Sequence, residues 1–516
     1  MVPEECANII GDTYGGHVIP FGRMQSAHLR ARRVAMNPRW QRRCPMSTTP
    51  SRGKRRREVR IVSKRKIPLP PQLKRLNLNA AGIDIGSEEH WAAIPPGRDS
   101  EGRDVRRFGA FTGDLCSLAD WLKQCEIETV AMESTGVYWI ALYELLVERG
   151  FEVLLVDARQ AKTVPGRKTD VLDCQWLQEL HTYGLLRGAF RPVDQVCILR
   201  SYLRQRSMLV AYASHHIQHI QKALEQMNLK LAHVVSDITG LTGMGIIKAI
   251  VGGERDPAKL AKLRDPRCKN SEATVARALE GHYREEHLFA LKQAVELVEF
   301  YQHQITACDC QIEASLQQFE EKSREIPVTT RRRKHRRGGM AFDAHSYLYR
   351  MTGVDLTQID SIEGNTALTV IGEIGLDMSR WPTEKHFGSW LGLAPGSKVS
   401  GGKRLSSRTK PSANRAAAAL RLAAQSLNQS QSALGAYFRR LKARLGAPKA
   451  LTAAAYKLAR ILYRMLKYGA GYVDQGEAAY EERYRYRLLR NLKRRAAELG
   501  FHLTAITSNT GQPALT

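Results

Sequence analysis

Four acidic side chains are placed where they could act together on a phosphate group. Asp84 lies within an otherwise apolar predicted strand, where a buried, unpaired carboxylate would cost several kcal/mol. Glu133 ends another such strand, and Asp170 and Asp173 stand three residues apart on one face of a predicted helix start. Each acid alone has a structural explanation, but four such oxygen ligands together suit Mg²⁺ (or Mn²⁺). Paired ions of this kind stabilise the attacking and leaving oxygens of phosphoryl transfer.

A second candidate for chemistry is Ser400, which is followed by two glycines and by Lys403 and Arg404. Glycine permits close approach of another backbone, and the two cations can hold a phosphate. A serine hydroxyl is a weak nucleophile unless a base or a metal ion activates it. The spacing alone therefore favours an ordinary loop serine at this position.

The elements that must position the four acids form a mixed α/β pattern. Strands are predicted at 81–86, 91–94, 105–111, 128–133 and 152–156, and helices at 115–125, 137–149 and 170–183. Strands that come first and then alternate with helices indicate a mixed sheet, and strand ends are where such folds place their chemistry.

After Pro192 the sequence becomes mostly helical. Two sets of apolar residues recur every seven positions: Leu203, Val210, Ile217 and Leu224, and then Leu291, Val298, Ile305 and Ile312. Arg206 interrupts the seam that accompanies the first set. The period predicts two long helices of a coiled coil or helical arm, paired either within the chain or across a dimer.

The region 345–503 is rich in Ala, Leu and Arg and is predicted to be mainly α-helical. Within it, 360–375 reads as helix, turn, helix, with Gly372 and Gly375 near its end. Such a glycine turn either presents backbone N–H groups to a DNA phosphate or simply caps a helical hairpin.

The charge of the chain indicates a polyanionic partner, and nucleic acid is the usual one. Formal net charge is +28, and residues 1–75 supply half of it with 18 Lys and Arg against 4 Asp and Glu. A second basic run begins with Arg331, Arg332, Arg333 and Lys334, and it is either a clamp on a nucleic-acid backbone or a solvated charge run. Tyrosines interleave with arginines at 480–487, a pattern that can stack unpaired bases.

Five segments are predicted: a disordered basic extension at 1–75, an α/β domain at 76–192, a helical coiled-coil region with a basic linker at 193–344, a C-terminal domain at 345–503 and a flexible tail at 504–516. Nine scattered cysteines without a C-x-x-C pair indicate reduced thiols. There is no apolar run of roughly 18 residues and no signal-peptide pattern, so we expect a cytoplasmic protein with no membrane partner.

Three segments of the α/β region resemble the Asp-Glu-Asp-Asp transposases of the insertion sequence 110 family. They are Gly-Ile-Asp-Ile-Gly (82–86), Met-Glu-Ser-Thr-Gly-Val-Tyr-Trp (132–139) and Val-Pro-Gly-Arg-Lys-Thr-Asp-Val-Leu-Asp-Cys-Gln-Trp-Leu (164–177). The resemblance implies a RuvC-like fold of the ribonuclease H class. It also places Asp84, Glu133, Asp170 and Asp173 at the family's four catalytic, metal-binding acidic positions.

The stretch 387–404 is similar to the family's second transposase domain, in which an essential serine precedes a Gly-Gly-Lys segment. The resemblance thus makes Ser400 the nucleophile. Relatives often show two adjacent serines there, whereas this chain has Val399 at the first position. Ser397, three residues before Ser400, is the rival candidate.

The resemblance implies an enzyme that cleaves and rejoins DNA strands to move an insertion sequence. Its expected partners are DNA at the element ends and target, a structured guide RNA, and further copies of the chain in a dimer or tetramer. We expect the protein to be associated with the bacterial nucleoid. Two other functions stay open on sequence grounds. One is a metal-dependent junction resolvase or nuclease that uses water, and the other is a nucleic-acid-binding protein without catalysis.

Overall fold

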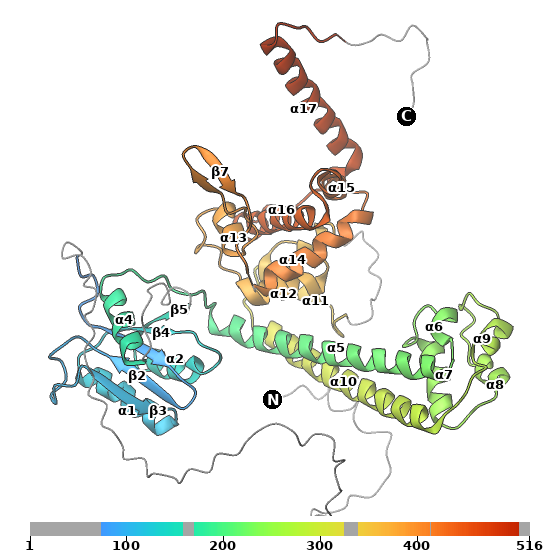
Figure 1. The fold of residues 1–516 in the computed structure, drawn as a ribbon, viewed down its shortest axis with the longest axis horizontal. Coiled ribbons are helices and arrows are strands. Elements are labelled where there is room, and N and C mark those ends of the chain that lie inside the picture. The colour runs from blue at the N-terminus through green and yellow to red at the C-terminus, as the bar shows by residue number, and fades with distance from the viewer. Residues whose placement is uncertain (1–73, 158–169, 325–338, 413, 505–516) are drawn as a thin grey trace, which may run out of the picture. The chain divides into compact units, whose positions relative to one another are not determined.

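The computed structural model describes residues 74–157, 170–324, 339–412 and 414–504 (Figure 1). Most of the extension predicted at 1–75, the basic run at 331–337 and nearly all of the tail at 504–516 lie outside the described residues. The chain divides into two compact units, one ending at Phe190 and the other beginning at Arg191. The further division of the second unit at 344 stays a prediction.

The first unit is built on a five-stranded mixed sheet in the order β3-β2-β1-β4-β5. Its strands are β1 (Ala80–Ile85), β2 (Glu89–Ala93), β3 (Val105–Gly109), β4 (Thr129–Glu133) and β5 (Glu152–Val156). Strands β1, β4 and β5 are parallel, while β2 runs antiparallel to both β1 and β3. This order and these directions fit the ribonuclease H-like fold that the sequence predicts.

Helices lie on both faces of this sheet. On one face, Ile83, Val130 and Met132 join a core with α1 (Thr112–Gln124) and α2 (Trp139–Glu148). On the other face lies α4 (Asp170–Thr182), whose buried His181 contacts Thr129 of β4. Side chains of a strand alternate between the two faces of a sheet. The apolar residues named above therefore face α1 and α2, and the residues between them along each strand face α4.

The second unit contains two helices of 33 residues each, α5 (Asp194–Gln226) and α10 (Glu285–Gln317), which lie side by side (Figure 1). The two helices that the seven-residue repeats predict therefore pair within one chain. Their coiled-coil geometry stays a prediction. Arg206 does not break the seam but is buried in it, forming an ion pair with the equally buried Asp309 of α10. A further hydrogen bond of 2.7 Å joins its Nη2 to the carbonyl of Gly339.

The segment 232–285, whose role the sequence does not predict, lies mostly in four short helices at the far end of this pair (Figure 1). They are α6 (Leu231–Val234), α7 (Leu241–Val251), α8 (Pro257–Lys262) and α9 (Glu272–Ala278). Their apolar residues share one core with the adjoining ends of α5 and α10. The four helices thus cover the end of the α5–α10 helix pair.

The rest of the second unit is mainly helical, as predicted. Its elements are α11 (Ala344–Thr352), η3 (Leu356–Gln358), α12 (Gly364–Ile374), α13 (Glu384–Trp390), β6 (Lys398–Ser400), β7 (Lys403–Ser406), α14 (Arg415–Ser426), η4 (Leu427–Gln429), α15 (Ala433–Leu445), α16 (Ala447–Tyr468) and α17 (Gly476–Glu498). In the part of the chain that is described, no helix is long and apolar enough to cross a membrane.

The helix-turn-helix predicted for 360–375 is wrong in detail. A turn at 360–363 leads into a single helix, α12, and Gly372 lies inside that helix where it crosses α5. A Cβ at Gly372 would meet the Leu203 side chain at 2.6 Å, and Arg200 Nε donates to the Gly372 carbonyl at 2.9 Å. Gly372 thus serves helix packing here. Gly375 follows α12 with φ +73°, a left-handed conformation that glycine adopts without strain.

Candidate active site

Gly82 allows α4 to lie directly on the strand that carries Asp84. A side chain at Gly82 would place its Cβ 2.2 Å from the backbone nitrogen of Gln178 and 2.4 Å from the carbonyl oxygen of Cys174, both in α4. Since residues two apart on a strand point to the same face, the half-buried Asp84 lies on this side of the sheet. The close approach of α4 therefore brings its first turns toward the Asp84 carboxylate.

Glu133 is the neighbour of Asp84 on the adjacent strand. The parallel register pairs Ile83 with Met132, so the next positions along β1 and β4 place the two acids beside each other on the α4 side. Glu133 is buried, and its Oε1 accepts a hydrogen bond of 2.8 Å from Thr135 Oγ1. This bond holds the Glu133 carboxylate in one orientation at the end of its strand.

Asp173 joins the same neighbourhood through Cys174. Burial, and then the negative charges of Asp84 and Asp173, raise the pKa of the Cys174 thiol to about 12. The thiol is therefore neutral at physiological pH, and its Sγ donates to the carbonyl of Val171 at 3.2 Å. Asp173 directly precedes Cys174 in α4, so its place near β1 follows from the close contact of α4 with that strand.

The chemistry of these donors fits a divalent cation. Carboxylate oxygens are the ligands that Mg²⁺ and Mn²⁺ prefer, and like charges gathered at one place are stabilised by a cation. Asp170 begins α4, but its side chain lies outside the described residues. Within the side chains that are described, no group of three or more His, Cys, Asp and Glu is placed to hold a metal ion. The four-carboxylate metal site thus stays a prediction.

Ser400 is the last residue of β6, at the tip of a β-hairpin that projects from the helices of the second unit (Figure 1). The turn is Gly401-Gly402, with φ of +54° and +73°, values that glycine adopts without strain and that match a two-residue hairpin turn. Ser400 and the neighbouring Ser397 are both exposed. The hairpin therefore leaves Ser400 accessible at its tip.

Lys403 is paired with Ser400 directly across this turn. Paired residues of antiparallel strands point to the same face, with Cβ atoms roughly 4.5–5.5 Å apart. The exposed Lys403 can therefore place its ammonium group beside a phosphate that contacts Ser400. The side chain of Arg404 and the residues Arg331, Arg332, Arg333 and Lys334 lie outside the described residues.

Several residues that support the site were missed in the sequence analysis. Thr135 orients Glu133, and Gly82 sets the position of α4, although both stand inside the motifs quoted above. The spacing around Ser400 favours a loop, yet Gly-Gly between two short runs is a known hairpin signal. That signal could have predicted the pairing of Ser400 with Lys403.

Two family models match separate parts of the chain. One, described as a transposase of the Asp-Glu-Asp-Asp type, matches residues 81–229, and the other, described as "Transposase IS116/IS110/IS902 family", matches residues 355–439. The first match spans the sheet and the four acids, and the second spans the hairpin of Ser400. Among curated proteins, none matches the chain significantly.

The two matched regions define a DNA transposase, an enzyme that acts on DNA, and the mixed sheet fits a ribonuclease H-like fold. The chain belongs to the insertion sequence 110 family of transposases, as its sequence motifs predict.

Proposed function

We propose that this transposase cuts and rejoins DNA with Ser400 as its nucleophile, assisted by the carboxylates Asp84, Glu133, Asp170 and Asp173. The observation that carries the proposal is the hairpin, because it presents Ser400 at an exposed tip with Lys403 opposite. A nucleophile that must reach a DNA phosphate needs such an open position. A cation beside it stabilises the charge that develops on the phosphate.

The four carboxylates would hold Mg²⁺ (or Mn²⁺) on the α4 side of the sheet. When bound, such an ion stabilises negative charge on phosphate oxygens. The chain's own part is to keep the acids in place: Thr135 orients Glu133 through its hydroxyl, and Gly82 lets α4, which carries Asp173, lie directly on the strand of Asp84. Transposases of the Asp-Glu-Asp-Asp type typically depend on a divalent metal ion, which supports this assignment.

The covalent step is a transesterification. The Oγ of Ser400 forms a bond to phosphorus, the bond between phosphorus and one DNA oxygen breaks, and the serine proton leaves to a base while the departing oxygen gains a proton. A hydroxyl of a second DNA end then attacks the phosphoserine and releases Ser400. The phosphodiester count is unchanged, so no outside energy source is needed.

This mechanism requires the hairpin of the second unit to reach the acids of the first. An assembly of several copies on DNA, a dimer or tetramer, would allow the serine of one chain to act with the acids of the same chain or of another. We include in the proposal a structured guide RNA, which the net charge of +28 can accommodate, and a cytoplasmic location on the bacterial nucleoid.

The test is a strand-transfer assay with purified full-length protein, its element RNA, Mg²⁺ and DNA carrying both junctions. We expect Ser400→Ala and Asp84→Asn to abolish joined product, and Ser397→Ala, the matched control, to retain it. Full cleavage by Ser400→Ala would identify a water-using nuclease or resolvase instead. DNA binding without cleavage by the unaltered chain would identify a non-catalytic binding protein.

A further inference from the structure

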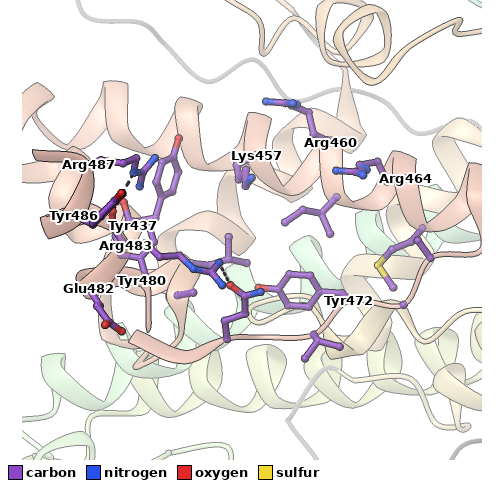
Figure 2. A pocket seen from close by; sticks show the side chains of 18 residues that line it. Tyr437, Lys457, Arg460, Arg464, Tyr472, Tyr480, Glu482, Arg483, Tyr486 and Arg487 are labelled. Atoms are coloured by element: carbon purple, nitrogen blue, oxygen red, sulfur yellow. Dashed lines mark hydrogen bonds between the residues drawn. The ribbon is translucent and has the colours of Figure 1, made fainter. Parts of the chain in front are cut away.

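A large cavity lies among the last three helices of the second unit (Figure 2). All residues that line it follow the Ser400 hairpin in the sequence. It is formed by α15, α16, α17 and the segment 470–475 that connects the last two. Its volume is about 1300 Å³, larger than the roughly 300–1,000 Å³ of a typical small-molecule pocket. The size favours an extended ligand.

The walls of the cavity are strongly basic. Helix α16 contributes Lys457, Arg460 and Arg464, which stand three and four residues apart and so share one helix face. Helix α17 contributes Arg483 and Arg487, which are also one turn apart. Such a concentration of positive charge attracts a polyanion.

Few acids offset these cations. Glu482 is the one acidic residue in the lining, and in Figure 2 it points away from the cations of α16. Arg460 pairs with Glu384 of α13, and Arg464 lies 4.0 Å from the same carboxylate. One glutamate shared by two arginines leaves the cavity with a clear excess of positive charge.

Tyrosines are interleaved with the cations. The lining includes Tyr437, Tyr472, Tyr480 and Tyr486, of which Tyr437 and Tyr480 contact each other edge to face with ring centroids 6.4 Å apart. Tyr486 is 68% exposed, and Tyr472 lines the same cavity as Arg483, whose guanidinium donates to Gln475 Oε1 (Figure 2). Exposed aromatic faces next to cations are what single-stranded nucleic acids use for stacking and for phosphate contacts.

We propose that this cavity, which we call the tyrosine-arginine cavity, binds a short single-stranded stretch of nucleic acid. Its unpaired bases stack on Tyr472, Tyr480 or Tyr486, and its phosphates contact Lys457, Arg464 and Arg483. A duplex fits less well, because its bases are already stacked and paired and only its phosphates are available. The strand is either DNA melted near a junction or RNA, since both carry unpaired bases and phosphates.

This inference rests on the proposed function only in that both require nucleic acid as a ligand. Binding can therefore be measured in EDTA, where strand transfer does not contribute. If the cavity does not bind single strands, the proposal that Ser400 is the nucleophile is unaffected. If Ser400 is not the nucleophile, the proposal for the cavity is unaffected.

The experiment measures fluorescence anisotropy of labelled 15-residue oligothymidine, oligouridine and a 15-base-pair duplex with the full chain. The double change Arg464→Gln and Arg483→Gln is expected to weaken single-strand binding at least about tenfold. It should also lower the slope of log affinity against log salt by about 1 to 2. The matched control, Arg490→Gln with Lys493→Gln, removes the same charge from α17 outside the cavity lining and should change affinity less than about twofold. The two single strands distinguish DNA from RNA as the source.

A second readout locates the ligand. Oligonucleotides carrying 5-bromouracil or 4-thiouracil are irradiated with the protein, and the crosslinked peptides are identified by mass spectrometry. We expect crosslinks at Tyr472, Tyr480 or Tyr486. Equal loss of binding in the control variant, equal affinity for duplex, or crosslinks confined to residues outside the cavity would each overturn the proposal.

Discussion

Ser400 and Lys403 are paired residues of adjacent strands, separated only by the turn Gly401-Gly402. The two side chains therefore share one face at the tip of an exposed hairpin. In the proposed mechanism, this relationship places Lys403 beside the phosphate that Ser400 attacks.

Lys403→Ala should slow DNA cleavage by on the order of 10²-fold, because one positive charge that stabilises the developing phosphate charge is lost. Lys403→Arg should retain part of the rate, since it keeps the charge. The rate is measured in single-turnover cleavage of junction DNA. Lys410→Ala removes an exposed cation away from the turn and serves as the control. An equal loss in both alanine variants would contradict a specific role for Lys403.

Gly82→Val should separate α4 from β1. The new Cβ would lie 2.2 Å from backbone of α4, which cannot be relieved by a rotamer change. Overpacking of this kind costs about 1–3 kcal/mol or more, so we expect a lower melting temperature and loss of cleavage together. Gly113→Ala, where nothing lies within 4 Å of the new Cβ, should retain both. Normal cleavage by the Gly82→Val protein would show that the position of α4 is unimportant.

His181 should make the stability of the first unit depend on pH. Burial lowers the pKa of His181 from 6.5 to about 4, and the 2.8 Å contact of its Nε2 with Thr129 Oγ1 links α4 to β4. The unfolded chain therefore binds a proton more readily than the folded one between these values. Stability is full above about pH 6.5 and falls as the pH decreases toward 4, by on the order of 3 kcal/mol.

Hydrogen exchange of the β1 and β4 amides, corrected for its intrinsic pH dependence, measures this effect. His181→Gln should flatten the pH dependence, whereas His282→Gln, at an exposed position in the second unit, should not. An unchanged pH dependence in the His181 variant would show that other groups control it.

The buried ion pair Arg206–Asp309 should stabilise the second unit only when both residues are present. Asp309→Ala leaves an uncompensated charge between α5 and α10 and should destabilise the second unit by about 3–5 kcal/mol. Replacing both residues by leucine should restore most of that stability, because the seam is otherwise apolar. Urea unfolding of the three proteins makes the comparison. A double variant as unstable as Asp309→Ala would mean that the polar pair has no apolar substitute.

The sequence predicted the elements around the acids well because their signals are local. The strand at 152–156 and the helix predicted at 170–183 agree with β5 and α4 (Asp170–Thr182) of the structure, and apolar runs between polar turns indicated both. Contacts between distant residues could not be predicted in the same way. Arg206 looked like a break in a heptad seam, since its partner Asp309 is 103 positions away. Gly372 looked like a turn glycine for the same reason, because Leu203 decides its role.

The central claim is that Ser400 forms the covalent bond to DNA. The most direct test traps the reaction with a nicked junction substrate whose cleaved end diffuses away, and then maps the DNA-linked peptide by mass spectrometry. We predict a phosphodiester remnant on Ser400, present in the Ser397→Ala protein and absent from Ser400→Ala. A remnant on Ser397, or cleavage of the same substrate without any covalent adduct, would contradict the account.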